Sequence, residues 1–192
     1  MTEQLTEAPV DDLSDDQDHT IRRYTPEGEL LMTLGEPGVS GNDETHFGEP
    51  QDVAFLADGS VFVADGLENS RIVKFDAEGN FLKTWGEKGS GRGQFDAVHA
   101  VATDSVGNIY VADWGNNRVQ IYEPDGESLA ALYGDAVELS KAGVYIMGRD
   151  PETIKAFRRV KDVSHMGLFS RPVGIEVDAQ DRIIISDTCG RL

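Results

Sequence analysis

The sequence predicts an all-β protein that forms part of a β-propeller, and two observations carry this prediction. A block of residues recurs after 47 to 48 positions, pairing Val61–Asp65 and Arg71–Phe75 with Ile109–Asp113 and Arg118–Tyr122. These runs are rich in β-branched and aromatic residues, which favour the pleated, half-buried surface of a strand. A repeat of about 40–50 residues that holds four short strands is typical of propeller blades.

Glycine-closed turns and an upstream strand complete each repeat. Gly79 and Gly126 end short polar turns, where glycine accepts the positive φ that hairpins require. Upstream of the shared block, Asp52–Phe55 matches His99–Ala102 and supplies a further strand. No segment before Gly134 has the i, i+3, i+4 apolar spacing of an amphipathic helix. Each repeat is therefore predicted to be one four-stranded blade.

Two further copies of the repeat are incomplete. The segment from Asp15 to Gly28 aligns with Asp113 to Gly126, so the first copy supplies only its last two strands. Near the other end, Pro172–Val177 and Ile183–Asp187 read as the first two strands of a fourth copy. We therefore expect two full blades plus two half blades, in a chain that is a fragment of a larger propeller.

The repeat divides the chain into four regions. We expect an acidic, disordered segment at 1–14, blades at 15–134, a helical insertion at 135–168, and a truncated first half of a further blade at 169–192. The insertion is predicted because the repeat spacing breaks there, and Val137–Met147 and Pro151–Val160 have helical character. Such an insertion covers one rim of the propeller, either as a surface for a partner or as an inert addition.

Composition excludes several classes of function. The 192 residues carry a formal charge of −18, from 35 acidic and 17 basic side chains, which argues against a nucleic-acid partner. A single cysteine excludes an intramolecular disulfide and a cysteine-based zinc site. The sequence has no apolar run long enough to span a membrane, and its first residues do not form a signal peptide. A cytoplasmic location is the default expectation.

The chain resembles the NHL-repeat six-bladed propellers, and within them the peptidyl-α-hydroxyglycine α-amidating lyases and their bacterial relatives. The residues that carry the resemblance lie between about Asp15 and Tyr122, and include His46–Ala54, Phe62–Val73 and Val111–Asp113. This resemblance implies a propeller fold. It is less specific for activity, because many propellers of this kind are binding platforms.

The lyase resemblance implies a zinc ion held by three histidines, each of which opens a strand of a different blade after a proline. His99 occupies one such position, although Val98 replaces the proline, and Val173 stands where a second histidine is expected. The third ligand and the catalytic arginine would lie upstream of this sequence, and Leu67 stands where the family has its catalytic tyrosine. A lone imidazole holds zinc weakly. We therefore expect no catalysis from this chain by itself.

No cofactor is required by the sequence, and two metals remain open. Zinc at His99 follows from the lyase resemblance, and the resemblance also implies a structural calcium in the channel, bound largely by carbonyl oxygens. The alternative to a binding module is therefore a zinc-dependent lyase-like enzyme whose active site is incomplete in this chain.

Several recurring polar residues are expected to be structural. An aspartate follows the second strand of each blade, an asparagine lies in the next turn, and an arginine begins the third strand; these residues are Asp65, Asp113, Asp187, Asn69, Asn117, Arg71 and Arg118. We expect the aspartates to accept hydrogen bonds from the loop backbone and the arginines to bridge neighbouring elements. His19 falls at the Asn117 position, which indicates a role in a turn.

The rim loops are the predicted site of function. Leu67 and Trp114 follow equivalent strands, so they face the same rim, where an apolar or aromatic side chain can contact a ligand. Packing against a neighbouring loop is the alternative role. We expect a binding or scaffold module that docks a protein, peptide or small ligand on this rim. Its exposed blade edges also favour self-association, by pairing of two halves.

Overall fold

The computed structural model describes residues 18–133 and 171–187, and these form strands joined by turns and loops, with no helix among them. The predicted disordered segment at 1–14, the helical insertion at 135–168 and the last residues of the chain lie outside the described residues. The strands are β1 (Ile21–Tyr24), β2 (Leu30–Leu34), β3 (Pro50–Phe55), β4 (Val61–Asp65), β5 (Arg71–Phe75), β6 (Phe81–Trp85), β7 (Val98–Thr103), β8 (Ile109–Asp113), β9 (Arg118–Tyr122), β10 (Ser128–Tyr133), β11 (Pro172–Val177) and β12 (Ile183–Asp187).

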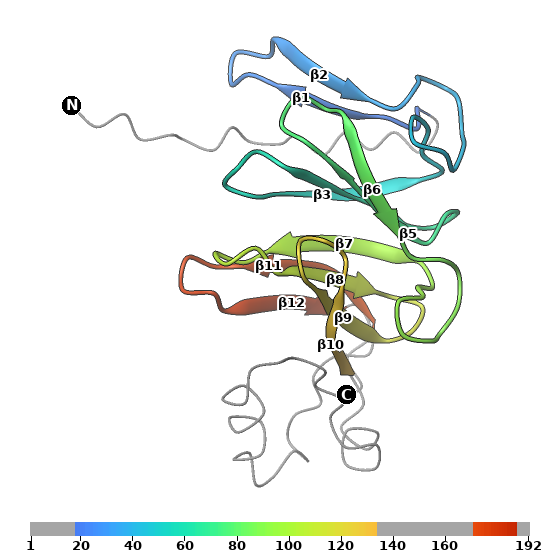
Figure 1. Cartoon of the computed structure of the whole chain (residues 1–192), viewed down its shortest axis with the longest axis vertical. Helices are drawn as coiled ribbons and strands as arrows, with labels where there is room; N and C mark the ends of the chain where they lie inside the picture. Colours follow the sequence, from blue (N-terminus) through green and yellow to red (C-terminus); the bar gives the residue numbers. More distant parts are fainter. Residues whose placement is uncertain (1–17, 134–170, 188–192) are drawn as a thin grey trace, which may run out of the picture.

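The strands form two complete blades and two half blades, as the sequence predicts. One four-stranded sheet has the order β3-β4-β5-β6 and the other has the order β7-β8-β9-β10. Two-stranded sheets of β1-β2 and β11-β12 lie at the two ends of the series (Figure 1). All pairs are antiparallel neighbours in the sequence, which is the meander of a propeller blade. The prediction of a partial propeller is therefore confirmed.

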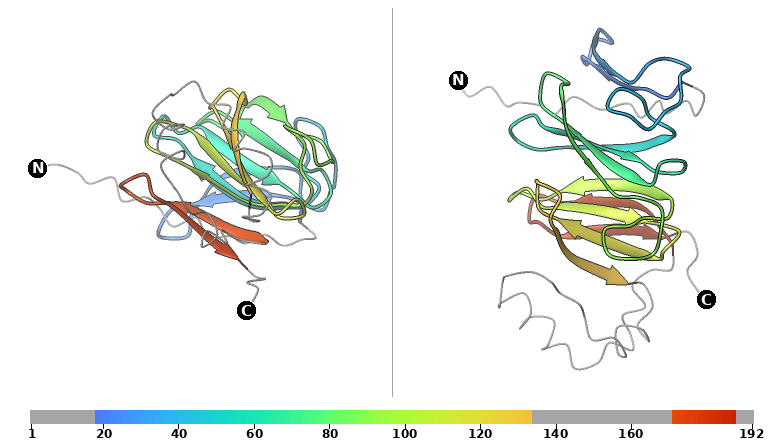
Figure 2. Two further views of the ribbon diagram at one scale, coloured as in Figure 1. Left: turned by 90° about the horizontal axis from the view of Figure 1, so that it is seen from below. Right: turned by 45° about the vertical axis from the view of Figure 1, so that its right-hand side comes forward.

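The sheets stand side by side with their first strands adjacent. Strand β7 contacts β3 on one side and β11 on the other, and the three sheets are stacked in that order in Figures 1 and 2. Two hydrogen bonds join β7 to β3: the Val101 amide donates to Asp52 Oδ2 at 2.9 Å, and the Thr103 hydroxyl donates to the Phe55 carbonyl at 2.7 Å. In these three sheets, the first strand (β3, β7 or β11) is therefore the innermost strand of a radial arrangement.

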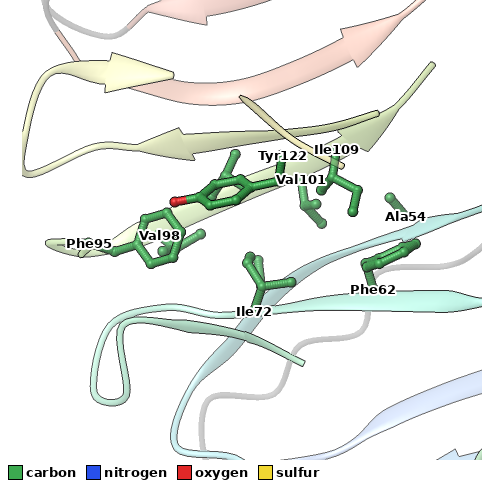
Figure 3. Packing of buried hydrophobic residues seen from close by; sticks show 10 residues of the cluster. Ala54, Phe62, Ile72, Phe95, Val98, Val101, Ile109 and Tyr122 are labelled. Carbon is green, nitrogen blue, oxygen red and sulfur yellow. The ribbon is translucent and has the colours of Figure 1, made fainter. Parts of the chain in front are cut away.

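The hydrophobic core lies between the blades. Successive residues of a strand point to opposite faces of its sheet, so each blade packs against the blade before it and the blade after it. Strand β8 shows this directly, because Ile109 and Val111 face the β3–β6 sheet while Tyr110 and Ala112 face β11–β12. Figure 3 shows the first of these layers, with Phe62 and the other labelled side chains filling the space between the two complete blades.

Buried aspartate–arginine pairs fasten each complete blade to the loop that enters it. Arg71 Nε donates to Asp65 at 2.8 Å, and Arg118 Nε donates to Asp113 at 2.7 Å, with all four side chains buried. The remaining guanidinium N–H groups of Arg118 donate at 2.7 to 3.0 Å to the carbonyls of Ser90, Gly91 and Gln94. Since these carbonyls belong to the long loop between β6 and β7, the pair fixes the entry of the chain into the blade.

The asparagine that supports this pair differs between the two blades. Asn69 reaches the aspartate of the first blade, but in the second blade Asn116, rather than Asn117, donates to Asp113 at 3.0 Å. The turn in the second blade is one residue shorter. Asn117 therefore falls at the left-handed position, with φ of 54°, that Ser70 occupies with φ of 51° in the first blade. Asparagine tolerates this conformation better than most residues.

No helix in the described residues is long and apolar enough to cross a membrane.

Candidate functional site

A bulge opens each of the innermost strands β3, β7 and β11, and one residue in each has no register partner. The register shifts between Pro50 and Asp52 in β3, and the same shift occurs after Val98 in β7 and Pro172 in β11. The bulged residue, which has no register partner on the neighbouring strand, is Gln51 in β3, His99 in β7 and Val173 in β11. A bulge re-aims a side chain out of the regular pleat, and bulges are common beside functional sites. These three positions are therefore structurally equivalent, as the sequence alignment of His99 with Val173 expects.

His99 is half-buried against an aromatic ring. Its imidazole packs on Trp114, with ring centroids 5.4 Å apart and planes inclined by 51°. Partial burial disfavours the charged imidazolium and lowers the pKa of His99 below its ordinary value of 6.5. The ring is therefore neutral at pH 7, so that it can accept or donate one hydrogen bond at its exposed edge.

Arg171 covers Trp114 from a third element of the chain. Its guanidinium carbon lies 4.8 Å from the Trp114 ring centroid, which is within cation–π range. The Arg171 side chain is exposed, and no carboxylate among the described residues forms a salt bridge with it. The sequence analysis missed this residue, because a long segment separates it from Trp114. We call His99, Trp114 and Arg171 the rim cluster.

Leu67 lies on the equivalent turn of the preceding blade. Leu67 is the second residue after β4, which is the position that Gly115 holds after β8. Leu67 is 39% exposed. Its neighbour Gly66 fits tightly against the start of β7, because a Cβ on Gly66 would lie 1.6 Å from the Val98 carbonyl oxygen. The turn that carries Leu67 is therefore pressed against the strand that carries His99, on the same rim as the cluster.

The residues at the rim do not fit a zinc site. Of the three equivalent bulge positions, only His99 offers a usual zinc ligand, since Gln51 and Val173 do not. Among the described residues, the only group of three potential ligands within reach of one another is Glu123, Asp125 and Glu127, in the turn between β9 and β10. That acidic turn shares no residue with the rim cluster. The rim cluster therefore supplies one zinc ligand, where a catalytic zinc site uses three.

The rim cluster has the chemistry of a recognition site. It offers an indole, which presents a large apolar surface, beside a guanidinium, which matches a carboxylate with two parallel N–H groups. The neutral His99 adds one hydrogen-bonding group at the edge of the indole. These groups can bind and orient a ligand, and the cluster contains no nucleophile paired with a base.

The aspartates of the repeat have structural partners near this rim. Asp65, Asp113 and Asp187 each accept a hydrogen bond from the backbone amide just before the innermost strand of their own blade, at 2.9, 2.8 and 3.0 Å. Burial raises the pKa of Asp113, and this effect is opposed by donors that include the Asp96 amide and Arg118. Each of these carboxylates therefore bonds to the segment that leads into the innermost strand of its own blade.

Comparison with known proteins agrees with the repeat found in the sequence. The pattern of the NHL repeat family matches residues 47–75 and 95–122. The chain is 35% identical over 118 residues to NHL repeat-containing protein 3 of Homo sapiens, covering 59% of this chain and 34% of that protein. It is 39% identical over 122 residues to the peptidylglycine alpha-amidating monooxygenase of Rattus norvegicus, covering 60% of this chain and 12% of that protein.

A third relative is a probable peptidyl-alpha-hydroxyglycine alpha-amidating lyase of Caenorhabditis elegans. The identity is 38% over 116 residues, which cover 59% of this chain and 33% of that protein. The chain thus spans about a third or less of the length of these curated relatives. These matches confirm the resemblance drawn from the repeat.

Proposed function

The chain carries NHL repeats at residues 47–75 and 95–122, and from this premise we propose that it is a binding module whose ligand docks on the rim cluster. The observation that carries the proposal is that Trp114 contacts both the His99 ring and the exposed guanidinium of Arg171. Exposed tryptophan and arginine are enriched among the residues that dominate binding energy. The rigid blades hold both side chains from separate elements, which limits the entropy lost on binding.

The chemistry of the cluster favours a peptide with a free carboxyl group as the ligand. The Arg171 guanidinium can form a bidentate pair with a carboxylate, while the Trp114 ring packs against the adjoining apolar side chain. The formal charge of −18 attracts basic groups to the rest of the surface. A basic peptide that ends in an apolar residue and a free carboxylate therefore combines the features that this rim recognises.

Tryptophan fluorescence provides the test. The chain has two tryptophans. Trp85 packs against the core residues Phe62 and Tyr122, whereas Trp114 belongs to the rim cluster. A ligand that docks on the rim should therefore change the emission of Trp114 and leave that of Trp85 unchanged. We expect saturable quenching by basic peptides that end in an apolar residue with a free carboxylate. The matched peptides with an amidated carboxyl end should bind about 10–100-fold more weakly, because a hydrogen bond to a charged group contributes about 1.5–3 kcal/mol.

Two arginine variants sharpen this test. Arg171→Leu should abolish the preference for the free carboxylate, and Arg182→Leu, which changes an exposed arginine in the β11–β12 turn, should leave it intact. Equal binding of the acid and amide peptides by the unmodified protein would refute carboxylate recognition. Peptides that leave the emission unchanged across the whole set would refute docking on Trp114.

A lyase-like enzyme is the second candidate, favoured by the names of two relatives and by His99 at a bulge position. The binding proposal predicts substoichiometric zinc in the purified chain and no turnover of a peptidyl-α-hydroxyglycine. One zinc per chain, together with turnover that is lost in His99→Ala, would favour the enzyme instead.

A further inference from the structure

The N-terminal half blade consists of the two outer strands of a blade. His19 has φ of 53° just before β1, as Ser70 and Asn117 have φ of 51° and 54° just before β5 and β9. The loop that follows β2 contains the bridge Ser40–Phe47, which matches the bridge Lys88–Phe95 in the loop that follows β6. Strands β1 and β2 therefore occupy the third and fourth positions of a blade.

The C-terminal half blade consists of the two inner strands. Strand β11 carries the bulge found in β3 and β7, and it contacts β7 as β7 contacts β3. Asp187 closes the hairpin by accepting the Arg171 amide, as Asp113 accepts the Asp96 amide. Strands β11 and β12 therefore occupy the first and second positions. Within residues 18–133 and 171–187, the two half blades therefore supply complementary positions of one blade.

Both half blades expose apolar side chains that complete blades cover. Ile184 in β12 is 56% exposed, although its equivalents Phe62 and Tyr110 are buried. Leu30 in β2 is 51% exposed, whereas its equivalent Phe81 in β6 packs against the core between the β1–β2 and β3–β6 sheets. Among the described residues, β12 pairs only with β11 and β1 pairs only with β2. Each half blade thus has an unpaired strand edge as well as an uncovered apolar face.

We propose that a second copy of this chain covers both surfaces, with β11–β12 of each copy pairing with β1–β2 of the other to form a shared four-stranded blade. The described residues of each copy contribute three innermost strands, β3, β7 and β11, so a closed ring built from the described blades of n copies has 3n blades. Propellers typically have about 4–8 blades, which only two copies satisfy. The product is a twofold-symmetric ring of six blades in which no sheet edge between half blades remains open.

The complete blades fix the register of the shared blade. In them, Ile109 faces Tyr122 and Asp113 faces Arg118 across the β8–β9 pair. The same register places Ile183 opposite Tyr24 and Asp187 opposite Thr20 of the second copy. The ring also brings two copies of the rim cluster to the same end of one channel.

A charge pair across the two copies supports this register. Arg22 in β1 occupies the position of Gln120 in β9, whose side chain donates to Asp113 Oδ2 at 3.1 Å. In the single chain Arg22 forms an ion pair with Asp18. In the shared blade, the position of Arg22 in one copy also lies beside Asp187 of the other. Thr20 stands where Arg118 stands in β9, so Arg22 is the basic residue of β1 nearest to this end of the shared blade.

Sedimentation equilibrium of the full chain at micromolar concentration tests the number of copies. We expect a single species with twice the mass of the 20.9 kDa chain. A monomer would overturn the proposal, and so would a ladder of larger species, because an interface that does not close a ring continues into open assemblies.

Disulfide trapping tests the register. The Arg23→Cys and Ile184→Cys pair, in a Cys189→Ser background, should yield a covalent dimer under oxidation, because these two positions face each other across β12–β1. The control pair Arg22→Cys and Ile184→Cys places the two thiols on opposite faces of the shared sheet and should remain uncross-linked. Equal trapping by the two pairs would overturn the register, as would trapping by the control pair alone.

Surface variants test the apolar contact. Ile184→Asp should convert the dimer to a monomer, whereas Leu82→Asp, at a similarly exposed apolar residue on the outermost strand of a complete blade, should leave it dimeric. A dimer that persists in Ile184→Asp would overturn the proposal. The Ile184 site is exposed in the single chain, so that the change leaves the core of the chain intact.

Discussion

Removal of Arg118 should cost a large part of the stability of the protein. The side chain is buried beside Asp113, donates to that carboxylate at 2.7 Å, and donates to three carbonyls of the loop that enters the blade. Arg118→Ala leaves the carboxylate buried without its cation. Breaking a buried pair in this way costs about 3–5 kcal/mol. Small domains have a free energy of unfolding of about 5–15 kcal/mol, so the loss is easily measured.

The pH dependence of this variant identifies the cause of the loss. Burial already raises the pKa of Asp113, and the Arg118 guanidinium opposes that rise. Without Arg118, the pKa of Asp113 in the folded state moves further above its unfolded value. A group with a raised folded-state pKa favours the folded state when it is protonated. The stability deficit of Arg118→Ala should therefore shrink as the pH falls through the raised pKa of Asp113.

Urea unfolding, followed by tryptophan fluorescence at one fixed protein concentration, measures both effects. Arg182→Ala is the control, because its ion pair with Asp178 is exposed and exposed pairs contribute little to stability. Arg118→Lys should recover part of the loss, since an ammonium restores the charge but cannot reach all the carbonyls that the guanidinium fork reaches. A loss below about 1 kcal/mol in Arg118→Ala would refute the structural role given to the pair.

Two further predictions concern the rim and the histidines. Gly66→Ala should lower the melting temperature and shift the emission of Trp114, because a Cβ there meets the Val98 carbonyl oxygen at 1.6 Å. An unchanged melting temperature would contradict that close contact. NMR titration should give His46 a pKa above 6.5, raised by its hydrogen bond to Asp43, and His99 a pKa below 6.5, lowered by burial. The contribution of His46 to stability is therefore present below pH 6.5 and lost as the pH rises through its raised pKa, while protonation of His99 destabilises the fold as the pH falls below 6.5. Asp43→Asn should return the His46 value toward 6.5, and coincident titration curves for the two histidines would contradict both assignments.

The strands could be predicted from the sequence because the repeat supplies two independent copies of each signal. Val61–Asp65 and Ile109–Asp113 are strands with the predicted bounds, and so are Pro172–Val177 and Ile183–Asp187 in the last half blade. The second strands of the complete blades are continuous apolar runs that are buried at every position, because both faces of the sheet are covered by neighbouring blades. The sequence does not state which neighbour each face contacts, since that depends on the order of the sheets in space.

The details of the rim could be predicted only in part. His99 and Trp114 follow from the alignment of the repeats, but their ring contact needs the geometry of the bulge. Arg171 reaches Trp114 from the far side of a long insertion, and no local pattern reports such a contact. The exchange of Asn117 for Asn116 arises from a turn shorter by one residue, which an alignment without gaps cannot register.

The amide of Val101 offers the most direct test of the radial arrangement of the blades. This N–H lies in β7 and donates across the blade boundary to the Asp52 carboxylate at 2.9 Å. Hydrogen exchange at Val101 should accelerate about 10–100-fold in Asp52→Ala, since a hydrogen bond to a charged group contributes about 1.5–3 kcal/mol. Unchanged exchange at Val101 would mean that β3 and β7 are not adjacent, which contradicts the propeller.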